Sequence, residues 1–317
     1  MTTPRRYLTR PGFTIVELLV VMTVIAILVG MLMAAVIPAM SAAKRARILM
    51  EMKQIEQSIE NFKTKNGFYP PSWVKFRAAA ALQQNENDGD IAAANYLLQY
   101  INRIAPNNQE GVGNPGSRPI DAWWQAVGKN VDHREGQDLV FWLSALSKNK
   151  QFPLTNDGTA TPKNAYDDQT YEREVFYEFK SAQLEIDGLA ATYMQQPGDL
   201  APFLYIDAKS YPILAGKTES EEDGFTGYYV QNPNGKSFEN PKTFQLICWG
   251  LDKLALDPDI PNPYPTRWAT QDASGNVSTA AGFGLGADKY ASDNLCNFCD
   301  GMLDRYLSGN FDSPAIK

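Results

Sequence analysis

The stretch of sequence that decides the fold is residues 12–37, which read GFTIVELLVVMTVIAILVGMLMAAVI. In the 25 residues from Phe13 to Ile37, the only ionisable side chain is that of Glu17. A helix of this length is roughly 37 Å long, whereas the hydrocarbon core of a bilayer is about 30 Å thick. The sequence therefore predicts a membrane-spanning helix near the N-terminus.

A cleaved secretory signal peptide is the alternative interpretation, because residues 39–41 and 41–43 resemble small-residue cleavage sites. Two features favour an anchor instead. The apolar run exceeds the usual signal-peptide core of about 7–15 residues, and Glu17 interrupts its start. Charge leaves the orientation open, since three basic residues flank each end of the run: Arg5, Arg6 and Arg10 before it, and Lys44, Arg45 and Arg47 after it.

Beyond Pro38 the apolar residues follow the period of an amphipathic helix. Five of them recur at spacings of four and three, which places them on one stripe: Ile48, Met52, Ile55, Ile59 and Phe62. Because proline can kink a membrane helix without ending it, we expect one helix over residues 13–66. Asn66-Gly67 and the prolines that follow are typical of a helix end.

Residues 67–317 are richer in turn-forming residues and predict a globular ectodomain. Within it we expect helices at residues 73–83, 91–104 and 138–147. Strands are expected at residues 174–179, 203–207, 227–231 and 244–249, with long loops at 84–90, 105–119, 153–170 and 257–282. These elements predict an α+β fold in which the second half of the long helix packs on an antiparallel sheet.

The composition excludes several classes of protein. The chain has 317 residues, of which 44% are hydrophobic and 21% charged, values that exclude wholesale disorder and a multi-pass membrane protein. A net charge of −7 argues against a nucleic-acid-binding protein, which would carry an excess of basic residues. The single histidine, His133, lacks a nucleophile context, so we do not expect an enzyme.

The segment from Gly12 to Glu17, with basic residues before it and a membrane-length helix after it, resembles the prepilin cleavage motif of type IV pilins and type II secretion pseudopilins. The resemblance implies that residues 1–12 are a leader, which prepilin peptidase removes by cutting between Gly12 and Phe13, and that the new N-terminus is methylated. It also implies a single pass through the bacterial inner membrane, with the N-terminus cytoplasmic and the ectodomain periplasmic or in an extracellular filament. Other pilin or pseudopilin subunits and a membrane assembly machinery are the implied partners.

The expected role of Glu17 follows from the cost of a charge inside a bilayer. An unpaired carboxylate near the bilayer centre costs about 2.5–3.5 kcal/mol. Cleavage would create an ammonium group on Phe13, about 6 Å along the helix from Glu17. We therefore expect Glu17 to neutralise such a group and to set the stagger between subunits. The alternative is that its side chain only extends to the membrane interface.

Two further stretches are similar to the major-pseudopilin branch of this family. Residues 51–71 (EMKQIEQSIENFKTKNGFYPP) resemble the end of its helix and the following turn, and residues 244–252 (FQLICWGLD) resemble its final strand and calcium loop. By that resemblance, Asp252 and Asp293 are the expected calcium ligands, although acidic loop residues are often merely solvated. Pro38 lies about one helical turn later than the family's usual proline, and the ectodomain is much longer than a typical major pseudopilin.

The three cysteines leave their pairing open. Cys296 and Cys299 are either a small disulfide or two thiols, and Cys248 is an alternative partner for either one. Taken together, the sequence predicts a pilin-like structural subunit of a pseudopilus or of a type IV pilus-like filament. The alternative from a different class is a membrane-tethered or exported binding protein that forms no filament.

Overall fold

The computed structural model describes twelve parts of the chain, which divides into two compact units, Met1–Arg47 and Ile48–Lys317. The described residues are 14–128, 136–159, 165–166, 171–188, 190–197, 202–211, 230–231, 237–238, 240–248, 270–271, 277–278 and 295–297.

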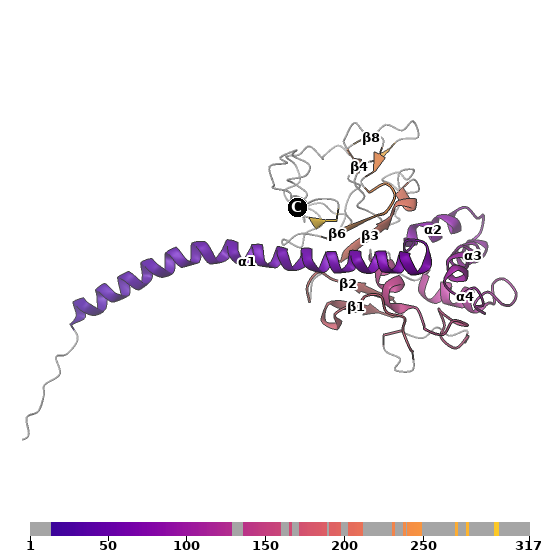
Figure 1. Ribbon diagram of the computed structural model, residues 1–317, viewed down its shortest axis with the longest axis horizontal. Helices are drawn as coiled ribbons and strands as arrows, with labels where there is room; N and C mark the ends of the chain where they lie inside the picture. Colours follow the sequence, from indigo (N-terminus) through magenta and orange to yellow (C-terminus); the bar gives the residue numbers. More distant parts are fainter. Residues whose placement is uncertain are drawn as a thin grey trace, which may run out of the picture. The chain divides into compact units, whose positions relative to one another are not determined.

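The longest element is helix α1 (Ile15–Asn66), drawn from indigo to purple in Figure 1. It runs without a break through position 38, which confirms that Pro38 does not end the helix. The backbone of Gly67 is left-handed, with φ of 80°, and its N–H donates to the carbonyl oxygen of Lys63 at 2.7 Å. This is the usual glycine end of a helix, at the predicted place.

The second half of α1 buries its predicted stripe in the core of the Ile48–Lys317 unit. The five stripe residues are at most 2% exposed. The ring of Phe62 packs against those of Phe68, Trp142 and Phe176, with centroids 5.6, 6.0 and 5.1 Å away. The three rings that cover Phe62 thus come from loop and helical residues rather than from strands.

Glu51 ties this half of α1 to a strand. Its carboxylate is only 3% exposed, and it accepts hydrogen bonds from the hydroxyl of Tyr193 and from the ammonium of Lys180, the latter at 2.7 Å. Tyr193 belongs to strand β2 (Ala190–Tyr193). Because a buried carboxylate is costly without such partners, these contacts fix the position of this half of α1 against β2.

Three helices follow α1 and group together in Figure 1: α2 (Trp73–Ala81), α3 (Glu86–Ile104) and α4 (Pro119–Trp123). The π-helical turn η1 (Trp124–Gly128) continues α4, and α5 (Gln137–Val140) continues into the π-helical turn η2 (Phe141–Ala145). Their aromatic rings pack with centroids 4.9–6.5 Å apart: Trp73, Phe76, Tyr100, Trp123, Phe141 and Trp142. Packing between aromatic rings therefore joins these helices and turns in the core.

The strands of the described residues form four small antiparallel sheets. One is the hairpin of β1 (Leu184–Asp187) and β2, and another has the order β3-β6-β9, with β3 (Phe203–Asp207), β6 (Phe244–Cys248) and β9 (Leu295–Cys296). The other two pair β4 (Val230–Gln231) with β5 (Ser237–Phe238) and β7 (Thr270–Gln271) with β8 (Val277–Ser278). Two short 3₁₀ turns, η3 (Ser181–Gln183) and η4 (Ala208–Ser210), precede β1 and follow β3. The α+β fold class is confirmed.

Several predicted elements need correction. Residues 174–179 are not a strand, because the backbone N–H groups of Phe176 and Tyr177 donate to the carbonyl of Leu143 in η2 rather than to a ladder. Helix α3 begins at Glu86 instead of residue 91, because the side chain of Asn85 caps it by accepting from the N–H of Asp88 at 2.8 Å. The hairpin β1–β2 was not predicted, whereas β3 and β6 lie where strands were expected.

Candidate functional site

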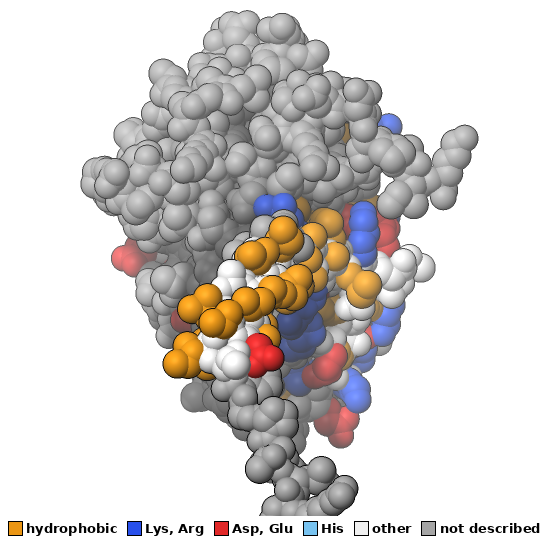
Figure 2. All heavy atoms as spheres, turned by 90° about the vertical axis from the view of Figure 1, so that its left-hand side faces the viewer, with side chains coloured by type: hydrophobic (Ala, Val, Ile, Leu, Met, Phe, Trp, Pro, Cys, Tyr) orange, Lys and Arg blue, Asp and Glu red, His pale blue; other side chains and the backbone are white. Residues whose placement is uncertain are grey.

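The first half of α1 exposes a continuous apolar surface. In the described part of the chain, Ile15–Met33 is the one helical stretch long and apolar enough to cross a membrane. Its large hydrophobic side chains are 45–84% exposed, and Figure 2 shows hydrophobic side chains over the part of α1 that faces the viewer. Isolated soluble proteins rarely expose such a surface, so it indicates contact with lipid or with other helices.

Glu17 lies at the start of this surface and is tied to Thr14. The backbone N–H and the hydroxyl of Thr14 each donate to Oε2 of Glu17 at 2.9 Å. In return, the N–H of Glu17 donates to Oγ1 of Thr14 at 3.2 Å. This reciprocal pair is a capping box, with Thr14 directly before the first helical residue and Glu17 three residues later.

The capping box gives Glu17 a local role that sequence reasoning missed, although the spacing Thr14-x-x-Glu17 is its usual signal. It places the only charged side chain of Ile15–Met33 beside the positive end of the helix dipole. The carboxylate therefore sits at one end of the apolar surface, where a cationic group would find an opposite charge.

Several residues singled out in the sequence lie outside the described part of the chain: Gly12, Phe13, His133, Asp252, Asp293 and Cys299. The cleavage site and the calcium ligands therefore stay predictions. Among the residues that the structure describes, no three His, Cys, Asp or Glu side chains come together as a metal site.

The register of β6 and β9 decides one question about the cysteines. Cys248 lies opposite Leu295, whereas Cys296 lies opposite Ile247. Because neighbouring residues of a strand point to opposite faces, the side chains of Cys248 and Cys296 lie on different faces of this sheet. Cys248 is accordingly a buried thiol outside any disulfide, and Cys296 is disulfide-bonded. Pairing of Cys296 with Cys299 remains a prediction.

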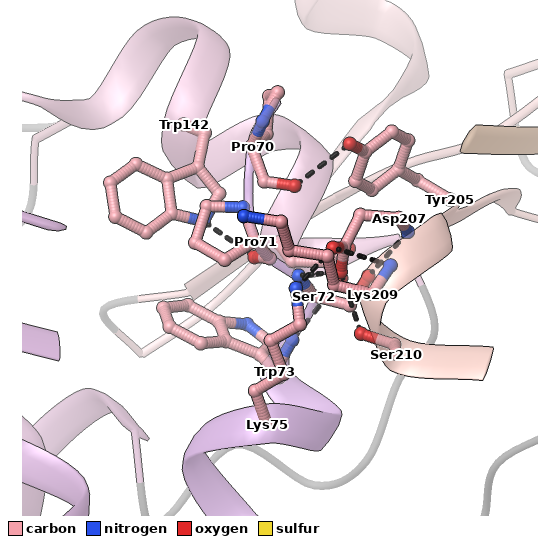
Figure 3. Close-up of polar contacts among 11 residues, drawn as sticks. Pro70, Pro71, Ser72, Trp73, Lys75, Trp142, Tyr205, Asp207, Lys209 and Ser210 are labelled. Carbon is pink, nitrogen blue, oxygen red and sulfur yellow. Dashed lines mark hydrogen bonds and ion pairs between the residues drawn. The ribbon is translucent and has the colours of Figure 1, made fainter. Parts of the chain in front are cut away.

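A buried polar cluster fixes the path of the chain after α1 (Figure 3). We call it the Asp207 cluster; it consists of the buried residues Ser72, Lys75, Asp207 and Ser210 and of the backbone N–H of Lys209, which is itself exposed. Oδ1 of Asp207 accepts from the N–H of Ser72 at 3.1 Å and from the hydroxyl of Ser210 at 2.6 Å. Oδ2 accepts from the ammonium of Lys75 and from the N–H of Lys209, the latter at 3.2 Å. The hydroxyl of Ser72 accepts from the N–H of Asp207 at 3.0 Å.

The Asp207 cluster is a stabilising feature rather than a reactive one. Burial lowers the pKa of Lys75, although the charge of Asp207 opposes that effect. Both carboxylate oxygens of Asp207 are engaged by two protein donors each. Two aromatic residues hold the preceding turn in the same way: Tyr205 donates to the carbonyl of Pro70 at 2.8 Å, and Trp142 donates to that of Pro71 at 2.9 Å.

A comparison with protein-family models matches residues 9–33 to the prokaryotic N-terminal methylation motif. Searches of curated proteins and of solved structures return no significant match. The matched motif covers the start of α1, with Thr14, Glu17 and the membrane-length segment. It supports a type IV pilin-like or pseudopilin precursor with a membrane-anchoring helix.

Proposed function

We propose that this chain is a structural subunit of a type II secretion pseudopilus or of a type IV pilus-like filament. The observation that carries the proposal is the first half of α1, an exposed apolar helix whose single carboxylate, Glu17, stands at its start within the matched methylation motif. Such a helix can span a bilayer before assembly and then pack against identical helices in a filament core.

Processing by prepilin peptidase is part of this proposal. Cleavage between Gly12 and Phe13 removes three arginines and no acidic residue, so the Lys and Arg count falls from 29 to 26 against 36 acidic residues. The mature chain then carries a net charge of −10 (26 minus 36). We place residues 1–12 in the cytoplasm and the acidic ectodomain on the outer side of the bacterial inner membrane.

The capping box suggests how Glu17 acts during assembly. In a single subunit, Thr14 satisfies the carboxylate of Glu17, which lowers the cost of holding that charge near the membrane. In a filament, the ammonium of a neighbouring Phe13 provides an opposite charge in a medium of low dielectric constant. The charge contact then fixes the stagger of one subunit against the next.

The finer features of the major-pseudopilin branch belong to the same proposal. Strand β6 leads toward Asp252, and β9 ends at Cys296, next to the expected calcium loop. We propose that calcium binds there through Asp252 and Asp293, and that a Cys296–Cys299 disulfide closes the end of the loop. The position of Cys248 on the other face of the sheet supports this pairing.

The test combines the mature N-terminus with assembly. In a host that has prepilin peptidase and the assembly machinery, we expect mass spectrometry to find a chain that begins at methylated Phe13. Glu17→Ala should abolish filaments seen by electron microscopy and leave membrane insertion intact. Glu56→Ala is the matched control, because it removes a carboxylate from the same helix, outside the membrane-length segment, whose ion-pair partner is the exposed Lys53.

Two results contradict the proposal. A mature chain that begins near residue 42 indicates a cleaved signal peptide and an ordinary exported protein. A chain processed at Phe13 that forms no filament, with or without Glu17, instead supports the membrane-tethered binding protein.

A further inference from the structure

The first half of α1 has a charge-free length that matches a whole bilayer rather than its hydrocarbon core. Residues 18–43 carry no ionisable side chain, and the run is bounded by Glu17 and Lys44. Along a helix, these two residues are about 40 Å apart, and a bilayer with its headgroups is about 40–45 Å thick. With Glu17 at one headgroup layer, Lys44 therefore reaches the opposite one.

Three basic residues occupy that second layer: Lys44, Arg45 and Arg47. Lys44 and Arg47 are exposed, whereas Arg45 is half-buried. In the described part of the chain, none of the three forms an ion pair or hydrogen bond with a side chain, and Nε of Arg45 is buried without any hydrogen-bond partner. The N–H groups of the exposed Lys44 and Arg47 are therefore open to an acceptor from outside the chain.

The nearest carboxylate along α1 is already engaged by other groups. Glu51 accepts from Lys180 and Tyr193. Ile48, the first residue of the buried stripe, follows Arg47 directly. The basic residues thus occupy the short stretch between the charge-free run and the first residue of the core.

We propose that Lys44, Arg45 and Arg47 form a binding site for the phosphate groups of anionic phospholipids in the outer leaflet of the membrane. This inference rests on the membrane-spanning part of the proposed function. Arginine binds phosphate oxygens through two parallel N–H groups, and lysine adds a compact positive charge. Each basic residue near an anionic surface contributes roughly a fivefold gain in affinity, so three independent contributions multiply to roughly a hundredfold. The site holds the subunit at a defined depth before assembly.

The experiment compares lipid retention by the full chain in the presence of two lipids. Chains are purified in detergent, mixed with phosphatidylglycerol or phosphatidylcholine, and the bound lipid is measured by native mass spectrometry. All chains carry Arg5→Gln, Arg6→Gln and Arg10→Gln, because the leader arginines would otherwise bind anionic lipid at the other end of the span. The test variant adds Lys44→Gln, Arg45→Gln and Arg47→Gln. A control adds Lys53→Gln and Lys148→Gln, which remove charge from two exposed lysines outside the proposed site, one in the second half of α1 and one in the ectodomain.

We expect the chain with the three basic residues to retain phosphatidylglycerol at least tenfold more tightly than phosphatidylcholine. The test variant should lose that preference, and the control should keep it. Equal retention of the two lipids, or a preference that survives in the test variant, overturns the inference. Circular dichroism checks that the variants keep their helix content.

The same preparations separate this inference from the proposed function. Reconstituted into vesicles, a chain that is removed by alkaline washing does not span the membrane, and both proposals then fail. A chain that stays in the vesicles but shows no preference for phosphatidylglycerol overturns the lipid site alone.

Discussion

The Asp207 cluster predicts a large cost for removing the charge of Lys75. The side chains of Lys75 and Asp207 are 3% and 4% exposed, so their ion pair lies in the interior. Lys75→Met keeps most of the aliphatic volume and removes the ammonium, which leaves a buried carboxylate without its cation. Such a loss typically costs about 3–5 kcal/mol.

The remaining contacts of Asp207 place the expected value at the lower end of that range. Its carboxylate keeps three donors, from Ser72, Lys209 and Ser210. We therefore expect Lys75→Met to lower the free energy of unfolding by about 3 kcal/mol. With a denaturant slope of about 3 kcal/mol per molar urea, the midpoint falls by about 1 M.

Tryptophan fluorescence of the full chain in detergent during urea unfolding measures this change. Four tryptophans are buried in the core and report its loss: Trp73, Trp123, Trp124 and Trp142. Lys53→Met is the control, because Lys53 is 69% exposed and pairs with Glu56 at the surface, where ion pairs contribute about 0–1 kcal/mol.

A double-mutant cycle tests the physical reason. We expect Lys75→Met with Asp207→Asn to cost about 1.5–3 kcal/mol less than the sum of the two single changes, the usual value for a hydrogen bond between charged groups. Strictly additive costs, or a Lys75→Met shift no larger than that of Lys53→Met, would refute the claim that this buried pair stabilises the fold.

Two further predictions concern loops of the ectodomain. Burial raises the pKa of Glu110, so the wild type loses stability as pH rises through that raised pKa. Relative to the wild type, Glu110→Gln should therefore gain stability by about 1.4 kcal/mol per pH unit between the pKa of the unfolded state and that of the folded state. Urea midpoints of the two proteins from pH 4 to 8 measure this gain. If Glu110→Gln instead gained stability relative to the wild type toward low pH, the prediction would be wrong. Gly136 has φ of 87° and lies against the carbonyl of Phe203 in β3, so Gly136→Ala should cost about 2–4 kcal/mol in thermal or urea unfolding. Gly188→Ala, with φ of 59° and open space around it, should cost only about 1–2 kcal/mol, and equal costs would show that the contact with Phe203 is unimportant.

Local sequence patterns predicted the elements whose burial follows from the order of their apolar residues. The stripe of α1 is buried as expected, because its spacing of three and four residues assigns one buried side. β3 and β6 are buried along their whole length, as short and largely apolar runs predict. The strand predicted at residues 174–179 was wrong for the opposite reason. Its aromatic residues and Val175 suit a strand, but in the described part of the chain Leu143 and Leu146, which lie outside the strands, accept three of its N–H groups.

The sequence by itself determined the N-terminal part of this protein. The apolar run, Glu17 and the end of α1 at Gly67 depend on interactions within a few residues, and these can be read along the chain. Only the tertiary structure decided which distant groups meet. Asp207 receives Ser72 and Lys75 from 135 and 132 residues away, and the β6–β9 register separates Cys248 from Cys296. Buried polar groups need hydrogen-bond partners, and the fold supplies them from residues far apart in the sequence. The spacing of residues along the chain does not predict those contacts.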